Sequence, residues 1–240
     1  MSGKLVRRSE LQDATRAEMY ALFCLQFDNV TREQFFSDLD EKNWVMLLHV
    51  DGELVGFSTL HVYPSRIDNE DLMLVYSGDT AVNSETWSDS ALSYHLMGAF
   101  GWLRRHYGCD RLYWFLLVSG YRTYRLLPVF SAVFYPRFDE PTPAAVQSLM
   151  HGMAIERFNG NYDPATGIVR LDAPSILKER FRGIPDNRMS DPNVAFFAER
   201  NPGHLQGDEL VCFCELAEEK LTKLGKRMWR KGQLLFQDSE

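Results

Sequence analysis

Apolar and polar positions alternate along the middle of the chain in a way that predicts β-structure. Two β-rich runs, at residues 44–50 and 54–62, flank the dipeptide Asp51-Gly52. The tightest hairpin turns need positive φ at both central residues, which makes Asp-Gly a strong turn signal. We therefore predict a β-hairpin here, and a third strand at residues 72–76 that extends it into an antiparallel meander.

A continuous apolar run at residues 112–118 ends abruptly in Ser119-Gly120. Seven consecutive apolar residues are typical of a strand that is buried on both faces. The preceding segment, 89–106, has an apolar face at helical spacing, formed by Leu92, Leu96, Ala99 and Leu103. A helix between two strands of one sheet makes a right-handed crossover, so strands 72–76 and 112–118 are predicted to be parallel neighbours.

Polar residues predict where several helices begin. Ser9 and Thr31 are each followed three residues later by a glutamine, which is the capping-box pattern. We expect a helix after Ser9, a shorter one from Thr31 to about Leu39, and a cap at Ser88 for helix 89–106. A further helix or helical turn is predicted from Tyr121, and Pro128 would kink or end it.

The chain changes character beyond residue 138. Proline at the first helical position predicts a helix over residues 142–158. A short strand at 168–171 and a short helix at 173–181 follow, and residues 182–206 are predicted to be mostly loop because they are rich in Pro, Asn, Gly and Asp. A late strand at 210–216 precedes an amphipathic, basic C-terminal helix.

Composition indicates an ordinary globular chain of 240 residues, 45% hydrophobic and 25% charged. No apolar run approaches the roughly 20 residues of a membrane-spanning helix, and the N-terminus lacks the apolar core of a signal peptide. Four cysteines indicate a reducing compartment, so the cytoplasm is expected. Cys212 and Cys214 are interpreted as small buried hydrophobic residues on one side of a strand, and no metal site is expected.

Charge is distributed unevenly along the chain. The net charge is −7, yet residues 104–137 hold six arginines and one aspartate, a local net charge of +5. These polar groups lie past the end of the buried strand, where open α/β sheets bind ligands, so an acidic ligand is expected there. The interleaved Tyr and Arg residues could suggest nucleic acid, but the overall charge and the acidic first half argue against it.

The order of these elements resembles the GNAT acyltransferase superfamily over about residues 5–136 and again at 210–216. The resemblance implies an α/β (α+β) fold: a mixed, mostly antiparallel sheet with a parallel, splayed central strand pair and flanking helices. Residues 1–240 would form a single domain, with 139–208 as a helical and loop insertion. In the family, the gap between the splayed strands accepts the pantetheine arm of an acyl thioester, and an amine attacks the thioester carbonyl directly.

The resemblance also bears on the acyl donor. GNAT members usually carry Gln/Arg-x-x-Gly-x-Gly/Ala after the fourth strand, where backbone N–H groups bind the pyrophosphate of coenzyme A. The corresponding stretch here, 77–88, has one glycine, neither Gln nor Arg, and unfavourable carboxylates. This departure favours acyl-phosphopantetheine on an acidic acyl carrier protein over acyl-CoA as co-substrate, with no permanently bound cofactor. Either the +5 stretch or the basic C-terminal helix would be its docking surface.

Candidate catalytic residues follow from the chemistry of amide formation. Asp79 would accept a proton from the amine, although Ser-Gly-Asp-Thr is also a turn sequence. Tyr121 or Tyr124 would protonate the leaving thiolate, as the resemblance implies, although both could simply pack against the sheet edge.

Other residues are expected to bind the donor. Arg122 and Arg125 would hold the phosphate, or else lie on a solvated helix face. The remaining pantetheine-binding candidates at the ends of the two strands are Tyr76, Ser77, Gly78 and Ser119. An apolar tunnel for the acyl chain would be lined by Leu117, Val129, Phe130 and Val133.

The hypothesis is an N-acyltransferase that moves a medium or long acyl chain from a carrier-protein or CoA thioester to an amine of an amino acid, polyamine or peptide side chain. The stretches 121–128 and 134–137 are similar to fatty N-acyl amino acid synthases and to maturases that acylate ribosomal peptides. A cationic acceptor would be attracted by an acidic surface at Asp68, Glu70, Asp71, Glu85 and Asp89. The alternatives are an acetyl-CoA-dependent acetyltransferase of small molecules and a non-catalytic acyl-binding protein.

Overall fold

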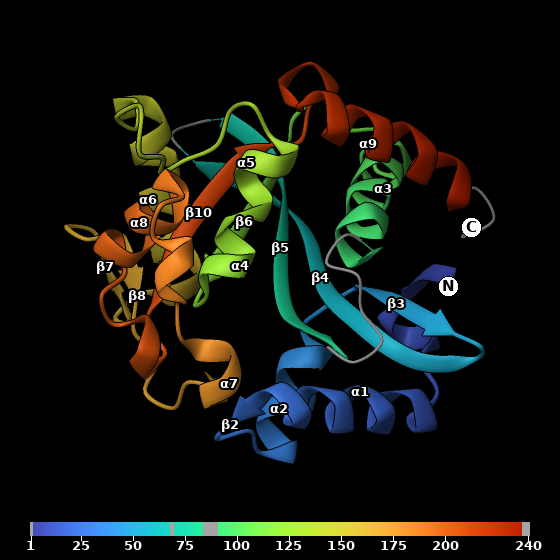
Figure 1. Ribbon diagram of the computed structural model, residues 1–240. Coiled ribbons are helices and arrows are strands. Elements are labelled where there is room, and N and C mark those ends of the chain that lie inside the picture. The colour runs from blue at the N-terminus through green and yellow to red at the C-terminus, as the bar shows by residue number, and fades with distance from the viewer. Residues whose placement is uncertain (1, 68–69, 84–90, 237–240) are drawn as a thin grey trace.

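A mixed sheet forms the centre of the computed structural model, which describes residues 2–67, 70–83 and 91–236. The strand order is β1-β3-β4-β5-β6-β10-β8-β7 (Figure 1). The main strands are β1 (Ser2–Arg7), β3 (Trp44–Val50), β4 (Glu53–Ile67), β5 (Glu70–Val82), β6 (Leu112–Val118) and β10 (Glu209–Glu215). Neighbouring strands are antiparallel except β5 and β6, which are parallel. This arrangement confirms the predicted fold class.

Helices cover both faces of this sheet. The longer ones are α1 (Asp13–Gln26), α2 (Arg32–Asp40), α3 (Ala91–His106), α6 (Ala144–Phe158), α8 (Pro192–Arg200) and α9 (Lys223–Leu235). Apolar residues of α3 and α9 pack on one face together with α4 (Tyr121–Tyr124) and α5 (Leu126–Phe130). Helices α1 and α2 pack on the other face at one end of the sheet, and α6 packs on that same face nearer its middle. None of the described helices is long and apolar enough to cross a membrane.

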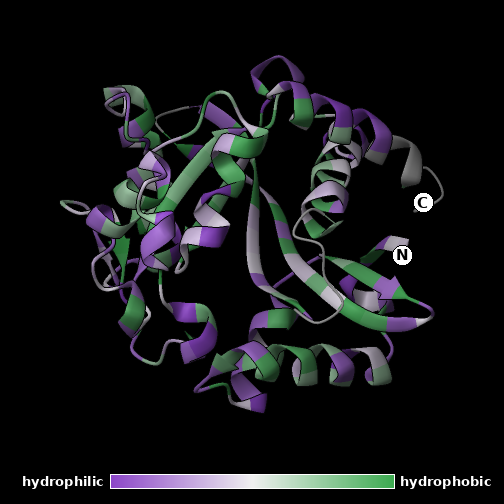
Figure 2. Ribbon diagram, in the orientation of Figure 1, coloured by the Kyte–Doolittle hydropathy of each residue, from purple (hydrophilic) through white to green (hydrophobic). Residues whose placement is uncertain are grey.

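Strand β6 is buried on both faces, as the apolar run predicts. Trp114 and Leu116 point toward α3, whereas Tyr113 and Phe115 point toward α6. The helices around the strand, by contrast, alternate between hydrophilic and hydrophobic residues along their length (Figure 2). Six of its seven residues are buried, so β6 forms the centre of the fold.

The parallel strands β5 and β6 separate from each other part-way along β5. Its pairing with β6 runs from Met73 opposite Leu112 to Ser77 opposite Leu116. Beyond that point β5 continues to Val82 alongside β4, not β6. The central strands therefore diverge toward their C-terminal ends, and we call the point where they part the fork.

The segment 139–208 adds elements on both sides of the fork. It contains α6, the edge strands β7 (Tyr162–Asp163) and β8 (Ile168–Val169), and helix α8, whose side chains join the main core. It also contains β9 (Ile176–Leu177) and α7 (Glu179–Arg182). Strand β9 pairs with β2 (Phe27–Asp28), which follows α1 directly, so this segment bridges distant parts of the chain.

Local predictions hold best where turn chemistry decides the conformation. Asp51 and Gly52 both have positive φ in the hairpin turn. Thr31 caps α2, because its hydroxyl accepts a hydrogen bond of 3.1 Å from the backbone N–H of Gln34. The predicted cap at Ser9 is wrong, since α1 begins at Asp13 after a 3-10 turn and Gln12 precedes it without a side-chain cap. The predicted cap at Ser88 lies outside the described residues.

Other corrections concern segments that have polar compositions. Residues 77–82 continue β5, although their sequence predicts a loop. Most of 182–206 was expected to be loop, yet it contains α8, which Asp191 caps by accepting a hydrogen bond from the N–H of Asn193. The helix predicted at 173–181 is instead strand β9 followed by one turn of helix. Pro128 lies within α5 and does not end it.

Candidate active site

A β-bulge in β5 forms the centre of the candidate site. Opposite β4, Ser77 pairs with Leu60 and Thr80 pairs with Ser58, so Gly78 and Asp79 together face a single residue. An extra residue of this kind reverses which face of the sheet the following side chains occupy. Tyr76 before the bulge and Ala81 after it accordingly pack on the same face, which α1, α2 and α6 cover. The bulge thus brings Asp79 to the fork on this face.

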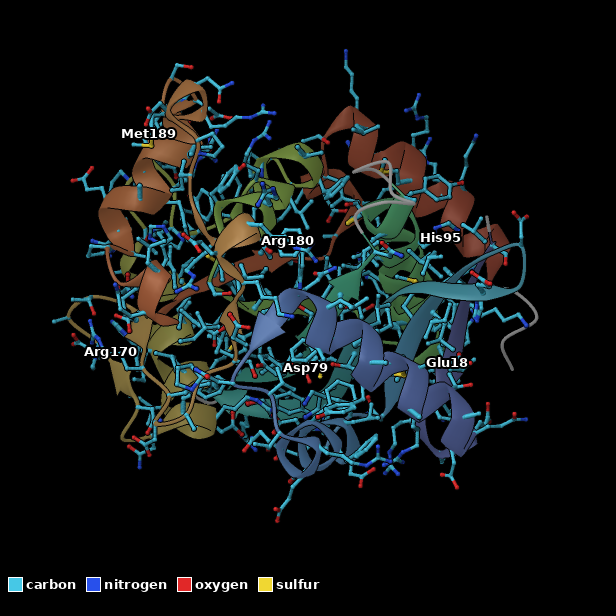
Figure 3. All side chains as sticks on the ribbon, turned by 60° about the horizontal axis from the view of Figure 1, so that its bottom comes forward. Glu18, Asp79, His95, Arg170, Arg180 and Met189 are labelled. Carbon is cyan, nitrogen blue, oxygen red and sulfur yellow. The ribbon has the colours of Figure 1, made fainter. Side chains whose placement is uncertain are left out.

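Asp79 has a strongly perturbed carboxyl group. It is half-buried and lies near the middle of the molecule, whereas Arg170 and Met189 lie at the rim (Figure 3). Burial raises the pKa of Asp79 to about 7, with the ammonium of Lys42 opposing the rise and the carboxylate of Asp38 adding to it. A carboxyl group with a pKa near neutrality can accept and release a proton under physiological conditions.

Lys42 is the cation that acts most on Asp79. It is only 5% exposed, and its Nζ donates a hydrogen bond of 2.7 Å to the backbone carbonyl of Asp38. Burial lowers the pKa of Lys42, and the negative charge of Asp79 opposes that fall. Nothing in the sequence distinguishes Lys42, because a lysine between a helix and a strand looks like an ordinary solvated residue.

Tyr76 lies between several charged and aromatic groups. The guanidinium carbon of Arg157 is 4.1 Å from the centre of its ring, and the Nζ of Lys42 is 5.7 Å from it. Arg157 in turn forms an ion pair of 2.9 Å with Glu41 and contacts Nδ1 of His61 at 3.3 Å. Burial raises the pKa of Tyr76, so its phenol stays protonated. Tyr76 is therefore held at the fork by residues far apart in sequence.

A second carboxyl group faces the fork from the opposite side. Glu209 begins β10, on the same face as Val211, which pairs with Leu117 of β6. Burial raises the pKa of Glu209 to about 8, and the negative charge of Asp79 adds to the rise. Neither carboxyl group forms an ion pair within 4 Å among the residues that the structure describes. Sequence reasoning had assigned Glu209 no role.

The two candidate general acids have different surroundings. Tyr124 is fully buried, and its hydroxyl donates a hydrogen bond of 2.8 Å to the carbonyl of Pro136. Burial raises its pKa further above the ordinary value. Tyr121 lies at the start of α4, directly after the end of β6, and the guanidinium of Arg122 covers its ring at 4.9 Å. The setting of Tyr124 is that of a structural residue. Tyr121 is also buried, with 4% of its surface exposed, and it packs in the core on the face that α3 covers, just beyond the C-terminal end of β6.

The arginines of the +5 stretch are largely engaged within the protein. Arg104 donates to the carbonyls of Cys109, Asp110 and Leu216. Further ion pairs join Arg111 to Glu70, Arg125 to Asp191 and Arg137 to Asp139. Arg122 is exposed and donates one hydrogen bond, of 2.8 Å, to the carbonyl of Phe181. Three of the six arginines are therefore paired with carboxylates and Arg104 is held by backbone carbonyls, whereas Arg122 keeps an exposed guanidinium just beyond the end of β6.

The other predicted donor-binding residues divide between the two faces. Ser77 accepts a hydrogen bond from the indole of Trp114 on the face that α3 covers. Gly78 packs against Lys42, and Ser119 is half-buried just after β6. Ser77 is thus engaged away from Asp79, although it sits at the last paired position before the fork.

The predicted acyl tunnel is not assembled as expected. Leu117 packs with the core under α6, whereas Phe130 belongs to the core on the opposite face. Val129 and Val133 are 38% and 36% exposed. These four side chains do not converge, because the sheet separates Leu117 from Phe130, and Val129 of α5 and Val133 beyond it are partly exposed to solvent.

The acidic surface that was predicted to attract a cationic acceptor lies away from Asp79, as far as the described residues show it. Glu70 and Asp71 begin β5, at the end of the strand away from Asp79, and they pair with Arg111 and Arg66. Asp68, Glu85 and Asp89 lie outside the described residues. Asp79 and Glu209 supply the carboxyl groups at the fork instead. No cluster of three or more His, Cys, Asp or Glu residues that could hold a metal ion occurs in the described ranges.

Comparisons with known proteins add the following. No protein-family model and no curated protein sequence matches the chain. Among solved structures, a probable N-acyltransferase from Enterococcus faecalis is 14% identical with a TM-score of 0.43, over 56% of this chain and 33% of that one, so the match spans a third of that protein. An IAA acetyltransferase from Bacillus cereus is 10% identical with a TM-score of 0.40, over 89% of this chain and 99% of that one.

A chain of the NatC complex bound to Gag peptide and CoA is 14% identical with a TM-score of 0.41, over 57% of this chain and 89% of that one. At these values the three likenesses do not bear on activity. Activity is inferred from the site.

Proposed function

We propose that the protein is an N-acyltransferase that transfers an acyl group from a thioester to an amine. One observation carries the proposal: the bulge places Asp79, with a pKa of about 7, where the parallel strands part. A proton acceptor with such a pKa suits an amine nucleophile, which must lose a proton to react. The fork leaves strand edges without a partner beside it, and an extended arm of a thioester could pair with them.

The reaction can be written with the groups at the fork. The carboxylate of Asp79 accepts a proton from the acceptor ammonium, directly or through water. The neutral nitrogen then attacks the thioester carbonyl carbon, a C–N bond forms, and the C–S bond breaks. The departing thiolate takes a proton from the hydroxyl of Tyr121. The nitrogen releases its second proton to water as the amide forms, and water later returns a proton to the tyrosinate and takes the one held by Asp79. No covalent enzyme intermediate is needed.

The donor is proposed to be a phosphopantetheine thioester, carried by an acyl carrier protein or by coenzyme A. Arg122 supports this assignment, because its guanidinium is exposed beside Tyr121 and can bind a phosphate through two N–H groups. A medium or long acyl chain is proposed from the likeness of residues 121–137 to fatty-acyl-transferring proteins. The acceptor is proposed to be an amine of an amino acid, a polyamine or a peptide side chain, whose ammonium the carboxylate of Asp79 attracts.

The test is a thiol-release assay with intact-mass detection of the acylated amine. Acetyl-CoA, a long-chain acyl-CoA and a long-chain acyl carrier protein are each offered with a panel of amines. We expect Asp79→Asn to reduce kcat/KM by about a hundredfold, within the range of general-base contributions. Asp51→Asn is the matched control, since Asp51 lies in the exposed hairpin turn and asparagine accepts its positive φ.

Each donor result has a definite meaning. Turnover with the long-chain carrier protein supports the full proposal, and turnover with acetyl-CoA alone identifies a small-molecule acetyltransferase instead. Binding of acylated donors without any amine product would identify a non-catalytic acyl-binding protein. Equal activities of Asp79→Asn and Asp51→Asn would contradict the role given to Asp79.

A further inference from the structure

Lys42 and Gly78 are packed unusually closely at the fork. A Cβ atom on Gly78 would lie 2.7 Å from Cε of Lys42, 3.4 Å from its Nζ and 2.9 Å from Oγ1 of Thr59. Real Cβ atoms do not approach other heavy atoms so closely, so a side chain at position 78 would force Lys42 to move. The absence of a side chain at Gly78 therefore makes room for the lysine beside the bulge.

The ammonium of Lys42 is buried without a carboxylate in contact. Its hydrogen bond to the carbonyl of Asp38 anchors it at the end of α2. Among the described residues, it forms no ion pair within 4 Å. Thr59, which is 1% exposed, lies beside it, and its Oγ1 has no hydrogen-bond partner among the described residues. A buried charge without a contact partner is costly, so a role for that charge is worth seeking.

The buried position of Lys42 also limits what it can do. A side chain that is 5% exposed and lies over Gly78 cannot reach a substrate in the fork. Its positive charge can still act on Asp79, one residue farther along β5, because the surrounding protein screens charge less than water does.

We propose that Lys42 is a positioning residue for the transfer reaction: its fixed ammonium keeps Asp79 ionised and able to accept a proton at neutral pH, and Gly78 provides the space that this requires. The inference rests on the proposed function, because it concerns the base of that reaction. Lys42 and Gly78 do not touch the substrate, yet through Asp79 they set the pH range in which the protein is active.

Other charged and titratable groups face the same region from every element packed against it. The carboxylates of Asp38 on α2 and of Glu41 just beyond it oppose the effect of Lys42, and Glu209 on β10 does so when it is ionised. Arg157 on α6 adds positive charge, and burial lowers the pKa of His61 on β4, which favours its neutral form. In the part of the chain that the structure describes, the groups that act on Asp79, on Lys42 or on their neighbours are Asp38, Glu41, His61, Tyr76, Arg157 and Glu209.

The kinetic test compares pH profiles of kcat/KM for three variants. Lys42→Met keeps the apolar stem and removes the charge, Gly78→Ala displaces the lysine, and Lys223→Met removes an exposed lysine of α9 as a control. We expect the acidic limb to move to higher pH by about one unit in the first two variants and to stay in place in the third. At pH values above this limb, Lys42→Met and Gly78→Ala should regain most of the activity of the natural protein. A general loss of activity without any movement of the limb would overturn the proposal.

A second measurement does not depend on activity. Asp79→Asn is introduced into the natural protein and into Lys42→Met, and unfolding is followed at pH 8. If Lys42 stabilises the carboxylate, the amide substitution must stabilise the Lys42→Met protein more than the natural one. Equal effects in both backgrounds would overturn the proposal. If coupling is found but no thioester is consumed, the proposed function fails while the influence of Lys42 on Asp79 stands.

Discussion

The indole Nε1 of Trp114 donates a hydrogen bond of 2.8 Å to the hydroxyl of Ser77. Trp114 lies on β6, and Ser77 is the last residue of β5 that pairs with this strand. The bond therefore joins the two strands just before they diverge, on the face away from Asp79. It gives Ser77 a structural role at a position where the sequence had suggested donor binding.

Replacement of Ser77 should consequently affect stability before it affects catalysis. Ser77→Ala leaves the indole N–H of Trp114 without a partner, and we expect a loss of about 1–3 kcal/mol in the free energy of unfolding. Urea unfolding followed by tryptophan fluorescence measures this directly. Ser190→Ala is a suitable control, because Ser190 is exposed and makes only a weak bond of 3.4 Å. A raised KM for the donor with unchanged stability would restore the binding role of Ser77.

The raised pKa of Asp79 predicts how stability depends on pH. The group changes from an ordinary value of 3.8 to about 7 on folding, so between these values the folded protein holds a proton that the unfolded chain has lost. The stability contributed by this group is complete below about pH 4 and is lost as the pH rises through 7. Asp79→Asn removes this dependence.

The variant should therefore gain melting temperature relative to the natural protein as the pH rises from 5 to 8. Differential scanning fluorimetry across this range gives the comparison. Asp51→Asn serves again as the control and should show a constant difference from the natural protein. A gain for Asp79→Asn that is the same at every pH would mean that the carboxyl group titrates normally.

The two tyrosines of α4 can be separated by matched substitutions. Tyr124→Phe loses the hydrogen bond to Pro136, which should cost about 1 kcal/mol of stability and leave kcat nearly unchanged. Tyr121→Phe loses the proposed proton donor, and kcat should fall by about a hundredfold with thioesters of poorly acidic thiols. An activated aryl thioester, whose thiolate needs no proton, should restore most of the rate. The reverse pattern would assign the acid to Tyr124.

The sequence predicts an element correctly where local side-chain chemistry determines it, and less well where pairing with a neighbouring strand determines it. The hairpin at Asp51-Gly52 and the apolar strand β6 have the predicted positions. Residues 77–82 contain small and polar side chains, which read as a loop, but β4 provides hydrogen-bond partners that hold them in a strand. Helix α8 was missed because its apolar run, residues 194–198, is short and lies in a segment rich in Pro, Asn, Gly and Asp.

The candidate site shows the same limit. Asp79 was predicted because it follows an apolar strand, which is a local pattern. Lys42 and Arg157 reach the fork only through packing of α2 and α6 on the sheet, and no spacing in the sequence relates them to Asp79. The faces on which Ser77 and Asp79 lie also depend on the bulge. A register change of this kind is a property of the paired strands and not of one segment.

Arg122 and Arg125 provide a final pair of substitutions with opposite expected effects. Arg122 is exposed beside Tyr121 and makes one hydrogen bond, to the carbonyl of Phe181, so Arg122→Ala should raise KM for the thioester donor about tenfold with little change in stability. Arg125 is held by Asp191 at 3.1 Å, and its charge is already compensated. Arg125→Ala should leave KM unchanged and lower stability by up to about 1 kcal/mol. Steady-state kinetics and urea unfolding of both variants decide this, and a larger KM for Arg125→Ala would move the phosphate site one helical turn along the chain.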